Sequence, residues 1–205
     1  QADNTVLQEY IANADVYEEN NYTPGTWEAF RSALDAAKNA VGQTGASQED
    51  YNQAAADLLK AVAGLSEKAD KTRLGKELND SWYTETLYTP GSWKNYIDTR
   101  KQAQQVYDDP EAKQKQVDDA ADALAKAKMD LIFVASKDEL RKKLDEAGQL
   151  KAEDYTEGWD ALQSVLKEAQ KVYDDPEATQ AQVDEQTEAV SQAIDELVEK
   201  PVELP

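Results

Sequence analysis

The chain has 205 residues, with 42 acidic and 22 basic side chains, a net charge of -20, and neither cysteine nor histidine. Without these two residue types there is no disulfide, no thiol chemistry, no zinc site of the usual nitrogen and sulfur type, and no Ser-His-Asp triad. The acidic charge repels phosphate backbones and anionic lipids, so we expect no nucleic acid and no membrane surface as partner. The longest apolar run, from Leu131 to Ala135, is far shorter than the roughly 20 residues that span a bilayer, so we expect no membrane insertion.

The first predicted helix has apolar residues at helical spacing from Leu7 to Ala14. The second helix begins after Tyr22, where Thr23 is the expected N-cap, Pro24 fits the first helical position, and Tyr22 can pack on Trp27 as a hydrophobic staple. Its apolar residues recur every three or four positions from Trp27 to Val41, and the same spacing predicts a third helix from Tyr51 to Leu65.

This three-helix pattern occurs three times, because Trp27, Trp93 and Trp159 lie one period of 66 residues apart. Short connections force neighbouring helices to run antiparallel. The predicted fold is therefore all-α, with three tandem antiparallel three-helix bundles, built from helices of about 15 to 20 residues, that form an elongated rod. The predicted domains are repeat 1 (1–68), repeat 2 (69–134) and repeat 3 (135–200), and residues 201–205 read as a linker.

Two motifs recur in the copies and carry a family resemblance. Tyr88-Thr89-Pro90-Gly91-Ser92-Trp93 repeats the start of the second helix, and repeat 3 has the shorter form Tyr155-Thr156-Glu157-Gly158-Trp159. A turn of the type Val-Tyr-Asp-Asp-Pro, at 106–110 and 172–176, precedes the third helix in repeats 2 and 3. These motifs resemble the FIVAR module, although repeat 1 has Gly42 to Ser47 in place of the Asp-Asp-Pro turn.

The resemblance implies a non-catalytic three-helix module of secreted or cell-surface proteins of Gram-positive bacteria. Such modules stand beside glycoside hydrolases or in arrays of adhesins, and some are linked to binding of glycan or host matrix protein. The family offers no catalytic residues and no fixed ligand to carry over, so we expect no enzymatic activity and no cofactor.

The aromatic residues are the candidate binding residues. Tyr22, Trp27, Trp93, Tyr155 and Trp159 form the repeated structural motif and are expected to pack inward or at a bundle end rather than to form a sugar-stacking platform. Trp82 and Tyr83, beside Tyr88, have no expected aromatic counterpart in the other copies. They are the best candidate patch for a glycan or matrix protein, with local packing as the alternative.

The acidic turns are weaker candidates. Asp108, Asp109 and Glu111, with their copies in repeat 3, are rich in oxygen but lack the Asp-x-Asp-x-Asp-Gly pattern of a calcium loop, and acidic residues before a helix are expected from its dipole. We therefore predict no metal site. Paired carboxylates for glycoside hydrolysis are disfavoured, because thin bundles offer no deep pocket to raise one carboxyl pKa.

The junctions after the third helices differ in polarity. Ile132, Phe133 and Val134 are apolar, whereas the aligned residues of the other copies are mostly polar, so we expect these three to lie buried between repeats 2 and 3 and to stiffen that joint. Repeat 1, repeat 2, and repeat 3 together with residues 201–205 have 4, 10 and 8 basic and 11, 12 and 19 acidic side chains, which give net charges of -7, -2 and -11. Repeat 2 is the least charged, which fits a partner there.

We therefore expect a monomeric spacer and interaction module that holds neighbouring domains of a larger secreted or wall-attached protein away from the surface. The alternative function is binding of carbohydrate or host matrix protein through the aromatic residues of repeat 2.

Overall fold

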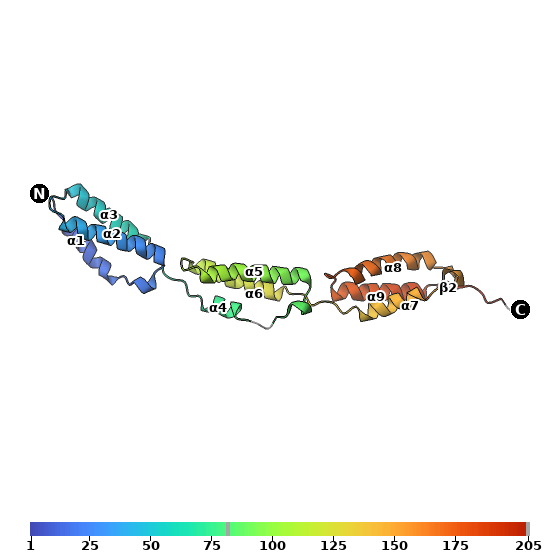
Figure 1. The fold of residues 1–205 in the computed structure, drawn as a ribbon. Helices are drawn as coiled ribbons and strands as arrows, with labels where there is room; N and C mark the ends of the chain where they lie inside the picture. The colour runs from blue at the N-terminus through green and yellow to red at the C-terminus, as the bar shows by residue number, and fades with distance from the viewer. Residues whose placement is uncertain (81–82, 204–205) are drawn as a thin grey trace. The chain divides into compact units, whose positions relative to one another are not determined.

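The computed structural model describes residues 1–80 and 83–203, and these form nine α-helices in three sets of three (Figure 1). The all-α class predicted from the sequence is confirmed. The first set comprises α1 (Thr5–Asn13), α2 (Pro24–Gly42) and α3 (Gln48–Ala63). The second comprises α4 (Thr72–Leu78), α5 (Pro90–Asp108) and α6 (Gln114–Met129). The third comprises α7 (Asp138–Gly148), α8 (Trp159–Asp174) and α9 (Gln180–Asp195).

Short 3₁₀ helices and one small sheet lie between these α-helices. The 3₁₀ helices are η1 (Ala14–Val16), η2 (Glu19–Asn21), η3 (Glu85–Leu87) and η4 (Ala152–Asp154). The strands β1 (Tyr155–Glu157) and β2 (Val198–Glu199) pair antiparallel. None of the helices in the described part of the chain is both long and apolar enough to cross a membrane.

Contacts divide the chain into two compact units. One unit holds residues 1–80 with 99–125, and the other holds the rest of the described chain. The first and third helix sets therefore each lie within one unit, and the second set contributes to both.

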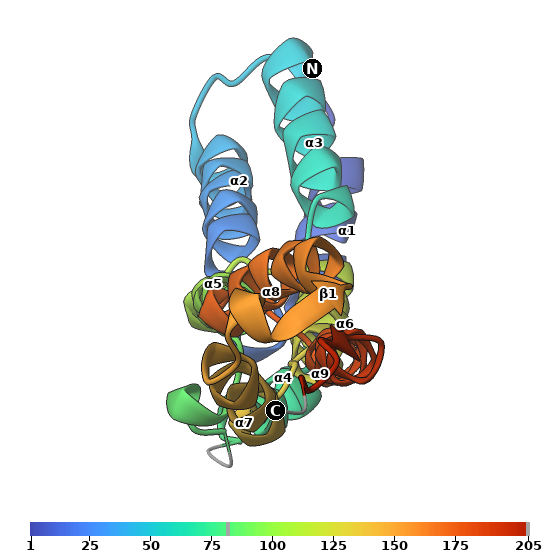
Figure 2. The ribbon, with the colours of Figure 1, turned by 90° about the vertical axis from the view of Figure 1, so that its right-hand side faces the viewer.

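The first set has a core of its own. Leu7, Phe30 and Leu58 come one from each helix and are buried together, as the apolar spacing predicts. Ala37 is completely buried in α2, and its small side chain lets the neighbouring helix approach closely. Figure 2 shows α2 and α3 running alongside each other, and α1 contacts both.

The third set repeats this arrangement with different side chains. Leu140 of α7, Leu162 and Ala169 of α8, and Val190 of α9 are completely buried in one cluster. Repeat 3 thus has aliphatic Leu162 where repeat 1 has Phe30, and its core contains no aromatic residue from that position.

The first helix of each set is shorter than expected. Helices α1, α4 and α7 have 9, 7 and 11 residues, whereas the sequence pattern led us to expect about 15 to 20. The residues between α1 and Tyr22 and between α7 and Tyr155 are irregular or 3₁₀, and η3 directly precedes Tyr88. The apolar spacing ends earlier in these segments than in the second and third helices, which is consistent with their shorter length.

At one end of each set, the segment before the second helix pairs through its backbone with the segment after the third helix, and we call this pairing the strap. Tyr22, Tyr88 and Tyr155 form β-bridges with Glu67, Phe133 and Glu199, respectively. In repeat 1 the Thr23 N–H donates to Ser66 O at 2.8 Å, and in repeat 2 the Thr89 N–H donates to Ile132 O at 2.8 Å. The strap joins residues more than 40 positions apart and is too short to give a strand periodicity, so the sequence did not predict it.

Candidate binding surface

A tyrosine and a tryptophan stack at the start of the second helix in every repeat. The rings of Tyr22 and Trp27, of Tyr88 and Trp93, and of Tyr155 and Trp159 have centroids 6.1 Å apart in each case. Their planes lie within 15° of parallel. All six side chains are half-buried, so each pair covers one end of its bundle and leaves part of its rings in contact with solvent.

Repeat 2 extends this pair into a larger aromatic cluster. Tyr83 lies 6.2 Å from Tyr88 and 5.5 Å from Tyr96, and Trp93 lies 5.1 Å from Tyr96, all between ring centroids. Tyr96 is buried, whereas Tyr83 and Tyr88 are half-buried. The ammonium of Lys128 lies over the Tyr83 ring, 5.9 Å from its centroid, in a cation–π geometry.

Of the three predicted binding residues, the structure brings Tyr83 and Tyr88 together, and Trp82 lies outside the described residues. We wrongly expected the tyrosine at 83 to have no aromatic counterpart. Tyr17 precedes Tyr22 by the same five positions, and its ring lies 6.1 Å from Tyr22 and 5.6 Å from Phe30. Repeat 3 has Leu150 at this position, packed against its core. Tyr17 lies one period of 66 residues before Tyr83, so the repeat spacing itself identifies it as the counterpart.

The feature that distinguishes repeat 2 is an exposed apolar patch, which we define as Leu87, Ile132, Phe133 and Val134. Their exposed fractions are 52%, 44%, 68% and 46%, respectively. The Val134 N–H donates to Leu87 O at 2.9 Å, so the strap places the four residues together. The ring of Phe133 stacks on Tyr88 at 5.1 Å and 22°, which makes the patch continuous with the aromatic cluster.

The predicted burial of Ile132, Phe133 and Val134 is therefore wrong. Their backbone pairs with the segment before α5 in the strap. The ring of Phe133 stacks on Tyr88 of repeat 2 and not on a residue of repeat 3. Alternating side chains of an extended segment point to opposite sides, so one short apolar run cannot bury all of its members on one neighbour. Their role in stiffening the junction stays a prediction.

The other two repeats have a mostly polar surface at the positions of this patch. The aligned residues in repeat 1 are Asn21, Ser66, Glu67 and Lys68. Those in repeat 3 are Asp154, Val198, Glu199 and Lys200. The chain thus contains two natural polar versions of the same surface, which makes the apolar version in repeat 2 a candidate for recognition.

The acidic turns use their carboxylates to hold the backbone. Asp109 Oδ1 accepts the Glu111 N–H at 2.8 Å, and Asp175 Oδ1 accepts the Glu177 N–H at 2.8 Å. Within the described ranges, no group of three or more acidic side chains is arranged to hold a metal ion.

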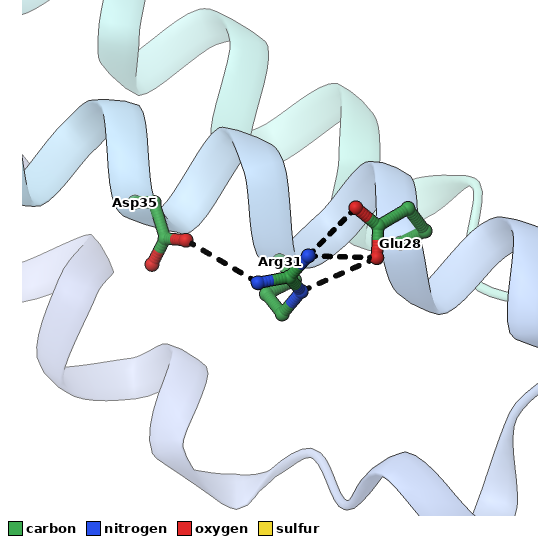
Figure 3. A network of polar contacts seen from close by, with 3 residues as sticks. All are labelled: Glu28, Arg31 and Asp35. Atoms are coloured by element: carbon green, nitrogen blue, oxygen red, sulfur yellow. Dashed lines mark hydrogen bonds and ion pairs between the residues drawn. The ribbon is translucent and has the colours of Figure 1, made fainter.

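A charged network on α2 does not form a site either. The guanidinium of Arg31 binds the carboxylate of Glu28 at 2.8 Å and lies 3.9 Å from that of Asp35 (Figure 3). Hydrogen bonding to Glu28 raises the pKa of Arg31 above its usual value. All three side chains are more than half exposed, so the network adds little stability, and Ile97 and Gln163 replace Arg31 in the other repeats.

A shallow groove lies between α2 and α3, and its lining residues do not include a pair of carboxyl groups that face each other. It has a volume of about 370 Å³ and is lined mainly by small residues such as Ala29, Ala33 and Ala61. Asp57 is the single carboxylate along it, with Lys60 nearby. This groove lacks the two facing carboxyl groups that glycoside hydrolysis requires.

Comparisons with known proteins agree with the repeat pattern. The FIVAR domain family matches residues 3–66, 70–131 and 136–198. The chain is also 34% identical over 205 residues to the polysaccharide lyase 8 family protein HylA of Enterococcus faecalis. That match covers 95% of this chain but 15% of the lyase, so the chain spans only a small part of its relative. No solved structure matches the chain.

Proposed function

Because the chain belongs to the FIVAR domain family, we propose that it is a non-catalytic spacer and interaction region of a larger secreted or wall-attached bacterial protein, either a polysaccharide-degrading enzyme or an adhesin. The observation that carries the proposal is the 34% identity to one small part, 15%, of a polysaccharide lyase. A region that makes up so small a share of an enzyme fits an accessory role.

The physical character of the repeats supports the same role. Repeats 1 and 3 have cores made entirely of their own residues, so each holds its shape without a ligand. The groove in repeat 1 is shallow and lacks a carboxylate pair. A net charge of -20 keeps the region well solvated between its neighbouring domains.

The apolar patch of repeat 2 favours a second candidate function, recognition of a neutral glycan or a host matrix protein. Phe133 presents most of its ring to solvent on top of Tyr88, and aromatic faces bind both sugar rings and apolar protein side chains. An anionic polysaccharide is the less suitable glycan, since the chain itself is strongly acidic.

Tryptophan fluorescence of the 205-residue chain, titrated with neutral polysaccharides, mucin and fibronectin, distinguishes the two functions. The test variant is Leu87→Asn with Phe133→Glu, which gives repeat 2 the residues that repeat 1 has at these positions. Trp82→Ala is a second variant. A spacer gives no saturable change with any ligand. Saturable binding that the double variant loses, while its circular dichroism is unchanged, supports recognition by repeat 2 and contradicts a purely structural role.

A further inference from the structure

The start of the second helix in repeats 1 and 2 holds a carboxylate from the following repeat. The Gly91 N–H, in the first turn of α5, donates to Glu177 Oε1 at 2.6 Å. The Gly25 N–H, in the first turn of α2, donates to Glu111 Oε1 in the same way. Both pairs are 86 residues apart in the chain. The first N–H groups of a helix have no partner within it, so these glutamates satisfy groups that otherwise need water.

A side chain at either glycine would crowd the carboxylate, because the carboxylate lies against the backbone. A Cβ atom on Gly91 would lie 2.9 Å from Glu177 Oε2 and 3.2 Å from its Cδ. On Gly25 it would lie 3.0 Å from Glu111 Oε1. A larger residue would displace this carboxylate, which is the flexible end of the glutamate side chain, and would lengthen its bond to the N–H.

The turn that carries each glutamate is held in a fixed conformation. Asp109 accepts the N–H of Glu111, and the ammonium of Lys71 donates to the carbonyl oxygens of Tyr107 and Asp109 at 2.8 and 2.7 Å. In repeat 3 the ammonium of Lys137 makes the equivalent two bonds, at 2.8 and 2.7 Å. Each glutamate is thus presented by an ordered turn rather than by a free loop.

The parts of this contact differ among the three repeats. Repeats 2 and 3 have the glutamate turn and its lysine, whereas repeat 1 has residues 42–47 in place of the turn and Asn4 at the helix-capping position that the lysines occupy. Repeats 1 and 2 have Pro-Gly at the helix start. Repeat 3 has Glu157-Gly158, and a Cβ on Gly158 would meet Glu196 O and Leu197 of the same repeat instead.

We propose that Glu111 and Glu177 are joint residues, each of which binds the helix start of the preceding repeat and restrains the connection between the two repeats. A carboxylate at a helix N-terminus is stabilised both by the free N–H groups and by the helix dipole. The contact is attractive between repeats that otherwise repel each other, since each has a negative net charge. This goes beyond the proposed spacer role, because a spacer works equally well with unrestrained connections.

Pairs of spin labels on the 205-residue chain test the proposal, and the absence of native cysteine allows each label to be placed by a single substitution. Exposed and equivalent sites are Ala29, Asn95 and Ala161. In the parent chain we expect narrow distance distributions for the 29–95 and 95–161 pairs. Gly91→Ala or Glu177→Ala should widen the 95–161 distribution about twofold and leave the 29–95 distribution unchanged. Gly25→Ala and Glu111→Ala should do the reverse.

Two further measurements separate loss of the joint from loss of folding. Alanine is the better helix former, so the glycine variants should keep their helix content and their melting temperature. The exchange rate of the Gly91 amide hydrogen should rise about tenfold in Glu177→Ala. Glu188→Gln, which removes one exposed charge from α9, should change neither the distances nor the exchange. Distributions that are equally broad in the parent chain and in the joint variants would overturn the proposal.

Discussion

Threonine 23 shows how one side chain serves a different purpose from the one its sequence position predicts. It is the N-cap of α2, as expected, but its hydroxyl does not accept a backbone N–H of the helix. It pairs with the hydroxyl of Thr26 at 2.7 Å, and Thr26 in turn accepts the Ser66 N–H at 3.2 Å. Thr89 and Ser92 form the same pair in repeat 2, at 2.9 Å. The buried threonine therefore helps to attach the strap to the helix start rather than to cap the helix.

The capping residue Asp50 gives a prediction about acid stability. The Ser47 N–H donates to Asp50 Oδ2 at 2.8 Å, and this bond and the serine side chain lower the pKa of Asp50 below its usual value. The stabilisation is complete above the unfolded pKa of about 3.9 and is lost as the pH falls through the lower folded pKa.

The test variant is Asp50→Gln, which copies the Thr179 and Gln182 pair of repeat 3 and cannot titrate. We expect the parent chain to lose stability relative to this variant as the pH falls from about 5 to about 2, measured by urea unfolding of repeat 1. A difference that stays constant over this range would contradict the assignment.

At the scale of the helix, the start of the third helix differs among the repeats in a way that stability measurements can detect. Thr179 accepts the Gln182 N–H at 3.2 Å and the Gln182 side chain accepts the Thr179 N–H at 2.9 Å, so the two residues form a capping box. In repeat 2 the side chain of Gln116 still accepts the Lys113 N–H at 2.8 Å, but a lysine cannot return the bond. Repeat 2 thus keeps one of the two hydrogen bonds of the capping box.

Substitutions at Thr179 and at Lys113 should change the free energy of unfolding in opposite directions. Thr179→Ala should destabilise repeat 3 by about 1 kcal/mol, because one helical N–H loses its acceptor. Lys113→Thr should stabilise repeat 2 by about 0.5 to 1 kcal/mol by completing its box. Chemical unfolding followed by circular dichroism measures both. A loss of stability in Lys113→Thr would show that the lysine has another role at this position.

At the scale of the whole molecule, the cores of repeats 1 and 3 are made of separate sets of residues. The buried residues of the first lie between Leu7 and Leu58, and those of the second lie between Ala135 and Ala193. No buried side chain is shared between these two clusters. A cavity in one core should therefore leave the other core intact.

Leu140 and Leu7 provide matched tests of this separation, since they occupy equivalent positions and both are buried. Leu140→Ala should destabilise repeat 3 by about 2 to 5 kcal/mol through lost burial and the cavity that it leaves. Hydrogen exchange measured on separate peptides should show faster exchange in repeat 3 and unchanged exchange in repeat 1. Leu7→Ala should give the opposite pattern, and faster exchange in both repeats for either variant would contradict separate cores.

Local patterns along the chain were enough to predict three copies of three helices, the resemblance to the family, and the apolar stripe of each helix in repeat 1. Leu7, Phe30 and Leu58 could be recognised because helical periodicity depends only on neighbours a few positions apart. The boundaries of the repeats at 68/69 and 134/135 stay predictions. Three features were not predictable in this way. They are the exposure of Phe133, the contact of the Tyr17 ring with Phe30, and the hydrogen bond between Glu177 and Gly91. Each depends on which distant segments meet when the strap and the turns close, and no spacing within a single helix records that.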